Sequence, residues 1–109
     1  MIVADARALA AAAPAPRADR PATAILHDVA DVRLVVFRIA PGQEVAPHTS
    51  SSTVVLTVLA GAGFVSGADG EAPVAVGHVV AYAPDERHGM RAAAEATEPL
   101  VLLAAITPR

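Results

Sequence analysis

Short apolar runs separated by turn residues recur about every 8 to 12 residues from Thr23 to the end of the chain. The runs are rich in Val, Ile and Leu, and they are too short for typical helices. The segments between them contain Gly, Pro and Asp, which favour turns. This rhythm is typical of an all-β sandwich or barrel, and it constrains the fold more than any other feature of the chain.

The run Val32–Ile39 is apolar on both alternating faces, which predicts a strand in the interior of a sheet. Gly67 to Gly70 predicts the tip of a hairpin, because Gly and Asp tolerate the positive φ of a tight turn. The other expected strands are Ala24–His27, Glu44–His48, Thr53–Leu59, Gly63–Val65, Val74–Val76, His78–Tyr82, Gly89–Ala92 and Leu100–Ile106.

The first part of the chain has a different character. Asp5 followed by an Ala-rich run that stops at Pro14 predicts a short capped helix, with a Pro-containing connector after it. We therefore divide the chain into a helix and connector, residues 1–22, and a β domain, residues 23–109. A secretory signal peptide is the alternative for the N-terminus, but Asp5 and Arg7 interrupt its apolar stretch, so we expect a cytoplasmic protein.

Composition limits the partners of this chain. Its 109 residues suit one domain, and no apolar run approaches the roughly 18 residues of a membrane span. The net charge of -3 and the scattered arginines exclude a basic stripe for nucleic acid. Because 54% of the residues are hydrophobic and only 17% charged, we expect part of the surface to be covered in a homodimer.

Cysteine is absent, which excludes disulfides, thiolate nucleophiles and thiolate metal ligands. A bound metal ion would have to be held by His, carboxylate, hydroxyl or water. The chemistry available to the chain is therefore that of imidazole and oxygen groups.

Two blocks of the sequence carry a resemblance to a known family. Gly42, His48 and Gly61 match the glycine and first-histidine spacings of the first cupin motif, written G-x5-H-x-H-x3-E-x6-G. The block from Gly77 to His88 resembles the second cupin motif, with a Pro four residues before its His. The chain is thus similar to small single-domain cupins (cupin 2 type, RmlC-like), which implies a double-stranded β-helix, or jelly-roll, barrel.

The match departs from the family at two ligand positions. The family pattern implies a metal held by three His and one Glu, whereas this chain has Ser50 and Val54 at the second His and the Glu. His48 and His88 remain as candidate ligands for one divalent ion, which could be Zn, Ni, Fe, Mn or Cu. The alternative is that the chain binds no metal ion. Loss of the carboxylate removes the anionic ligand that would neutralise a dication in a cavity of low dielectric.

The same residues predict a pocket inside the barrel. Alternation along a strand points His48 and Ser50 inward together, and Val54 keeps the same parity. The histidines can act as metal ligands, as general bases or as hydrogen-bonded pocket residues. Serines 50 to 52 are better explained as turn caps than as nucleophiles, because no orienting carboxylate or oxyanion hole accompanies them. Three larger side chains are also expected to line or close the pocket, namely Phe37, Tyr82 and Met90.

Three functional hypotheses follow. The first is a cupin domain that binds a small organic molecule around His48 and His88. The second is a metal-dependent cupin enzyme of the oxygenase or isomerase type. The third is a non-catalytic dimeric domain with a sensory or scaffold role. A shared fold does not choose among them, because the cupin barrel supports many activities.

Overall fold

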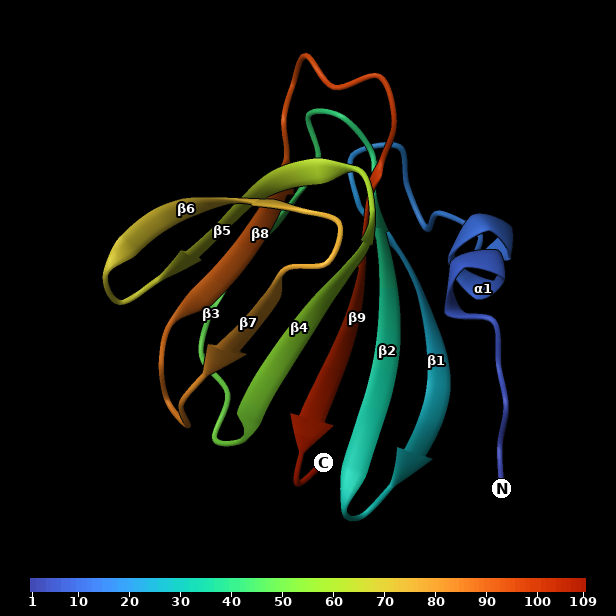
Figure 1. Ribbon diagram of the computed structural model, residues 1–109, viewed down its shortest axis with the longest axis vertical. Helices are drawn as coiled ribbons and strands as arrows, with labels where there is room; N and C mark the ends of the chain where they lie inside the picture. The colour runs from blue at the N-terminus through green and yellow to red at the C-terminus, as the bar shows by residue number, and fades with distance from the viewer.

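The computed structural model describes residues 1–109 as two antiparallel sheets that face each other, with one short helix outside them (Figure 1). The larger sheet has five strands in the order β1-β2-β9-β4-β7, and the smaller has four in the order β3-β8-β5-β6. In chain order the elements are α1 (Ala6–Ala12), β1 (Ala22–Val29), β2 (Val32–Ile39), β3 (Glu44–His48), β4 (Thr53–Ala60), β5 (Ala62–Gly67), β6 (Gly70–Ala75), β7 (Val79–Tyr82), β8 (His88–Ala92) and β9 (Leu100–Thr107).

This architecture confirms the predicted all-β barrel with a short N-terminal helix. The bounds of β2 and β3 agree with the sequence prediction, and the β5–β6 hairpin turns between Gly67 and Gly70 as expected. His78 is the one predicted strand start that lies outside its strand. Its side-chain Nδ1 accepts a hydrogen bond from the backbone N–H of Ala75 at 2.9 Å, so it caps the turn before β7.

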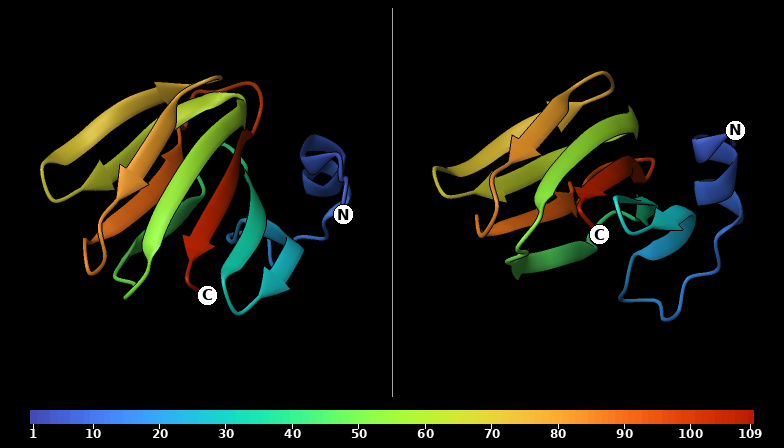
Figure 2. Two further views of the ribbon diagram at one scale, coloured as in Figure 1. Left: turned by 60° about the horizontal axis from the view of Figure 1, so that its bottom comes forward. Right: turned by 90° about the horizontal axis from the view of Figure 1, so that it is seen from below.

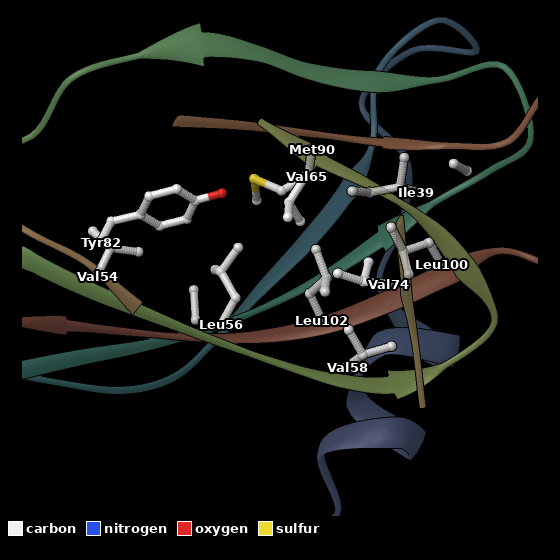
Figure 3. Close-up of a cluster of buried hydrophobic side chains, with 12 residues drawn as sticks. Ile39, Val54, Leu56, Val58, Val65, Val74, Tyr82, Met90, Leu100 and Leu102 are labelled. Atoms are coloured by element: carbon white, nitrogen blue, oxygen red, sulfur yellow. The ribbon is translucent and has the colours of Figure 1, made fainter. Parts of the chain in front are cut away.

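The core lies between the two sheets. Leu56, Leu100 and Leu102 are completely buried there, and side chains from β5, β6 and β8 meet them from the smaller sheet (Figure 3). Burial alternates along β4, with every second residue buried from Val54 to Val58. This period of two is the one that a strand with a single core-facing side requires.

The helix covers part of the outer face of the larger sheet. The carboxylate of Asp5 accepts a hydrogen bond from the backbone N–H of Ala8 at 3.0 Å and caps the helix. Ala10 packs against Val36 and Val101 on the sheet, and Figure 2 shows the helix beside β1 and β2. On the same outer face Arg38 donates to backbone carbonyls at the end of the helix. The helix therefore explains why β2 is apolar on both faces.

Several turns meet at the end of the barrel where β9 finishes. The β1–β2 turn, the β3–β4 loop, the β7–β8 turn and the C-terminal residues gather there (Figure 1). The backbone N–H of Asp85 donates to the carbonyl of Ser50 at 2.7 Å, and that of Arg109 donates to the carbonyl of Ala30 at 3.2 Å. These bonds tie the turns together around one opening, which we call the open end.

No helix in the structure is long and apolar enough to cross a membrane.

Candidate functional site

A cavity of about 340 Å³ lies at the open end. Several of its wall residues are exposed to solvent, including His48 and Ser51, so the cavity communicates with the outside. The residues that line it are Arg33, Phe37, His48, Ser50, Ser51, Ser52, Val54, Leu56, His88, Met90, Ala104, Ile106 and Arg109.

The two motif histidines meet in this cavity. His48 on β3 and His88 on β8 are cross-strand partners, and their ring centroids are 4.3 Å apart. Nδ1 of His48 lies 3.0 Å from the carbonyl oxygen of Ala46, and Nδ1 of His88 lies 2.9 Å from that of Glu86. Because a carbonyl can only accept, each Nδ1 must carry the hydrogen. Each Nε2 is thereby left for a bound molecule.

His88 is held more firmly than His48. Its side chain is buried, with the Tyr82 ring centroid 4.9 Å from its own, whereas His48 is exposed. Strand β3 is also irregular between Val45 and His48, which changes the pairing just before the histidine. We infer that His88 is the fixed member of the pair and that His48 is the adaptable one.

Tyr82 supports the site from behind and is not part of the cavity wall. Its hydroxyl donates to the carbonyl of Ser66 at 2.8 Å, and its ring belongs to the hydrophobic core. Burial, with a smaller contribution from nearby Glu86, raises the pKa of the Tyr82 phenol, so it stays a hydrogen donor. We expected Tyr82 to line or close the pocket, and it is not among the residues that line the cavity. A buried hydroxyl needs a hydrogen-bond partner, and that of Tyr82 finds one in Ser66 on β5.

The remaining predicted pocket residues lie on the cavity wall. Phe37 and Val54 come from the larger sheet, Met90 from the smaller, and Ser50 from the β3–β4 loop. The hydroxyl of Ser50 accepts a hydrogen bond from the backbone N–H of Ser52 at 3.1 Å, which agrees with a turn cap. The structure thus brings together the two histidines and these four residues.

The donor set does not fit the four-ligand metal centre that the cupin pattern implies. No cluster of three or more His, Cys, Asp or Glu side chains that could hold a metal exists in the chain. Glu86, the acidic residue closest in sequence to His88, is engaged elsewhere: its two carboxylate oxygens accept from the backbone N–H groups of Ala83 and Ala68, at 3.1 and 3.2 Å. Two imidazoles are the only strong ligands, so we derive no chemical step through a metal.

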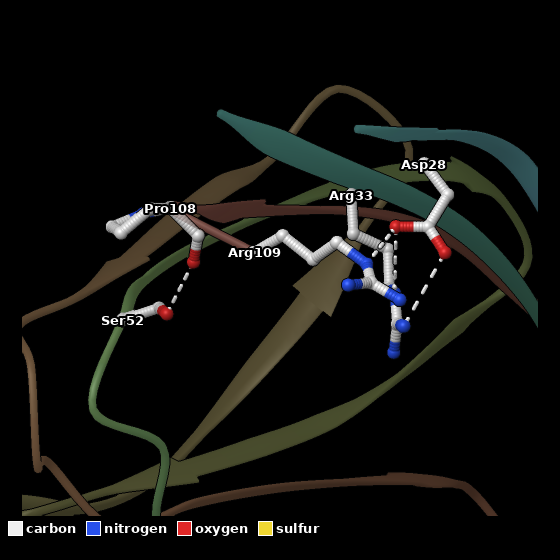
Figure 4. Close-up of polar contacts among 5 residues, drawn as sticks. All are labelled: Asp28, Arg33, Ser52, Pro108 and Arg109. Atoms are coloured by element: carbon white, nitrogen blue, oxygen red, sulfur yellow. Dashed lines mark hydrogen bonds and ion pairs between the residues drawn. The ribbon is translucent and has the colours of Figure 1, made fainter. Parts of the chain in front are cut away.

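Two arginines stand at the mouth of the cavity, and the sequence did not lead us to expect either of them there. Arg33 on β2 and Arg109 after β9 both contact the carboxylate of Asp28 on β1 (Figure 4). The hydrogen bond from Arg33, together with the charge of both guanidinium groups, holds the pKa of Asp28 below its ordinary value of 3.8. The sequence did contain a signal that Arg33 faces the cavity, because Arg33 and Phe37 are four residues apart on the same strand and point to the same face. No comparable signal pointed to Arg109.

Together, the two-sheet barrel and the histidine pair define a small domain of the cupin superfamily. Within it, a family model described as the AraC-like ligand-binding domain matches residues 33–103, which is more than half of the chain. The chain belongs to this family. No curated protein matches the sequence.

Solved structures agree with this fold. The protein TT1209 from Thermus thermophilus is similar over 100% of this chain and 99% of its own, with a TM-score of 0.85 and 24% identity. An RmlC-like cupin protein from Desulfovibrio desulfuricans is 26% identical, covers 82% of this chain and 83% of its own, and gives a TM-score of 0.71. An uncharacterized protein with a double-stranded β-helix domain from Klebsiella pneumoniae is 22% identical. The match covers 91% of this chain and 86% of that protein, with a TM-score of 0.79.

Proposed function

We propose that this protein binds a small organic molecule in the cavity around His48 and His88. The observation that carries the proposal is a cavity of about 340 Å³ whose wall combines six apolar residues with imidazole, hydroxyl and guanidinium groups. Binding sites for small molecules are concave, largely apolar and equipped with a small number of placed polar groups. The family of the chain is itself described by ligand binding, which supports the same function.

Apolar and polar residues of the cavity wall would have different roles in recognition. Phe37, Val54 and Ile106 offer apolar surface to the body of a bound molecule. The Nε2 atoms of His48 and His88 are the groups that would fix its orientation, because their Nδ1 atoms already donate to carbonyls. An organic ligand satisfies these groups without requiring the missing metal ligands.

The test is a thermal-shift screen of chemically defined probes, comprising monosaccharides, small amides, small carboxylates and aromatic alcohols. We expect at least one class to raise the melting temperature of the wild-type protein, because a ligand that binds only the folded state stabilises it. The rise should disappear in a His48→Ala/His88→Ala double variant. Stabilisation of equal size in that variant, or no stabilisation by any class, would contradict the proposal.

Metal content is a separate question that the same proteins answer. Elemental mass spectrometry on untagged wild-type protein, purified without added metal, should show less than one equivalent of Zn, Ni, Fe, Mn or Cu. A stoichiometric metal that is lost in the double variant would favour the metal-dependent enzyme over a metal-free binding domain.

We also propose that the protein is a cytoplasmic homodimer. The strands at both edges of the larger sheet carry exposed apolar side chains, among them Ile25 on β1 and Val79 on β7. Exposed edges of this kind invite pairing unless a partner covers them. A monomer in light scattering at micromolar concentration would contradict the dimer, and fractionation of the native cells tests the location.

A further inference from the structure

We infer that the cavity selects small organic molecules that carry a carboxylate, and that Arg33 and Arg109 receive this group at the mouth. This inference rests on the proposed ligand-binding function and narrows it to one chemical class. Its basis is the placement of two guanidinium groups on a cavity wall that also carries buried apolar side chains, among them Val54 and Leu56.

The position of Arg33 follows from strand alternation. Arg33 lies two residues before Val35 and four before Phe37 on β2, so the three side chains share the inner face of the larger sheet. Its cross-strand partner on β9 is Ile106, which also lines the cavity. An arginine is thus placed at the rim of a face that is otherwise apolar, in contrast to Arg38, which lies on the outer face against the helix.

The cavity wall contains two arginines and no acidic side chain. Two guanidinium groups share the single carboxylate of Asp28, which leaves one positive charge in excess among these three side chains. Nε and Nη2 of Arg33 each lie 3.3 Å from a carboxylate oxygen of Asp28, so Nη1 stays available to another acceptor. Asp28 therefore orients the arginine and does not use up its hydrogen-bond donors.

A carboxylate suits this arrangement better than other anions. One negative charge matches the single excess positive charge, whereas a phosphate ester brings about 1.5 to 2 negative charges. The planar guanidinium fork matches the two oxygens of a carboxylate in geometry as well as in charge. The organic part of such a molecule would then extend toward Phe37, Val54 and the two histidines.

Arg91 provides a matched control outside this cavity. It forms two hydrogen bonds with the carboxylate of Glu71, at 2.9 and 2.8 Å, and its guanidinium lies 4.1 Å from the centroid of the Phe64 ring. It resembles Arg33 in pairing with an acid on another strand of its sheet, yet it does not line the histidine cavity. Loss of Arg91 should therefore leave binding in that cavity unchanged.

The experiment uses matched pairs of probes, benzoate with benzamide, phenylacetate with phenylacetamide, and hexanoate with hexanamide. Dissociation constants are measured by calorimetry at low and physiological salt for wild type, Arg33→Met, Arg33→Lys and Arg91→Met. We expect at least one carboxylate to bind about 10 to 100 times more tightly than its amide, as a charge-assisted hydrogen-bond pair provides. Arg33→Met should abolish this preference, Arg33→Lys should retain part of it, and Arg91→Met should leave it intact.

Failure of the carboxylate inference can be distinguished from failure of the proposed ligand-binding function. If amides or monosaccharides bind in a histidine-dependent way and the carboxylates bind no better, the carboxylate inference is wrong and the proposed function stands. If carboxylates bind equally well to wild type and Arg33→Met, the arginine has no role in recognition and the inference is likewise wrong. If no probe of either class binds to wild type, both are overturned. Circular dichroism of each variant confirms that it is folded before binding is measured.

Discussion

The two ends of the barrel share the strands β2, β4 and β9 but differ in what fills the space between the sheets. Along β9, Leu100 and Leu102 are completely buried and fill the closed end. Two and four residues further on the same face, Ala104 and Ile106 line the cavity. The difference shows that the strand pattern sets which way a side chain points, whereas the packing between the two sheets decides whether the interior is core or pocket.

The open end also differs in polarity. At that end the inner faces carry His48, His88 and Arg33, and the polar groups around them belong to turns that are tied together by backbone hydrogen bonds. The closed end has aliphatic side chains at the corresponding positions. We expect substitutions at the closed end to change mainly stability, and those at the open end to change mainly binding.

The largest effect should come from Leu100→Ala at the closed end. Removal of a completely buried leucine side chain costs about 2 to 5 kcal/mol of unfolding free energy, because the surroundings collapse only partly into the space. The matched substitution at the open end is Ile106→Ala, which removes a half-buried side chain that already faces the cavity. It should cost clearly less in urea unfolding, and equal costs would contradict the distinction between the ends.

The converse substitution, Ala104→Leu, should fill the cavity. The added side chain enters a space of about 340 Å³ that can accept it, so we expect the fold to remain stable. The affinity of any probe that binds wild type should fall about tenfold or more, which corresponds to about 1.4 kcal/mol. Ala105→Leu is the control, because the neighbouring residue points to the opposite face of β9. Calorimetry on both variants measures the effect, and an equal loss in the control would show that the cavity is not the site.

A smaller difference should separate the two histidines. His88→Ala removes a buried ring packed against Tyr82 together with its hydrogen bond to the Glu86 carbonyl, so we expect a loss of about 1 to 2 kcal/mol. His48→Ala removes an exposed ring, and its cost in stability should stay within about 0.5 kcal/mol. Thermal and urea unfolding of both variants test this ranking. If His48→Ala were the more destabilising of the two, our assignment of the fixed and adaptable histidines would be wrong.

The smallest expected effect is on the dependence of stability on pH in the acid range. The pKa of Asp28 is lower in the folded state, by virtue of Arg33 and Arg109, than its ordinary value of 3.8, so the ionised carboxylate stabilises the fold. This contribution is fully present above the ordinary value and is lost as the pH falls through the lower folded value. An Asp28→Asn variant should therefore be less stable than wild type at neutral pH and should approach it below pH 3.8. A stability difference that is independent of pH in acid unfolding curves would contradict the ion pairs.

The fold could be predicted from the sequence because its signals are local. Alternation along Val32–Ile39, the glycines at the hairpin tip and the Asp5 cap each determine a short stretch of backbone. The meeting of His48 and His88 depended on motif spacing, and the structure brings their rings together. By contrast, Arg109 joins Asp28 and Arg33 only because β9 pairs with β2, which no local pattern specifies, whereas Asp28 and Arg33 are cross-strand partners within the β1–β2 hairpin.

Tyr82 illustrates the same limit inside the core. Strand parity could not distinguish a side chain that faces the cavity from one that packs behind a histidine, because both are buried. The deciding contact is the hydrogen bond to Ser66 on β5, a strand of the opposite sheet. Partners across two sheets are set by the tertiary arrangement, so residue alternation alone does not identify them.

The most direct test of the central claim, that the cavity at the open end is a binding site, uses the methionines. The chain has two, Met1 and Met90, and only Met90 lies in the cavity wall, whereas Met1 is fully exposed. Methyl-labelled methionine NMR during titration with the amide and carboxylate probes therefore contains its own control. We predict that the Met90 signal moves in a saturable way, that the Met1 signal does not, and that Ala104→Leu suppresses the change. Saturable binding that leaves Met90 unmoved would contradict the account.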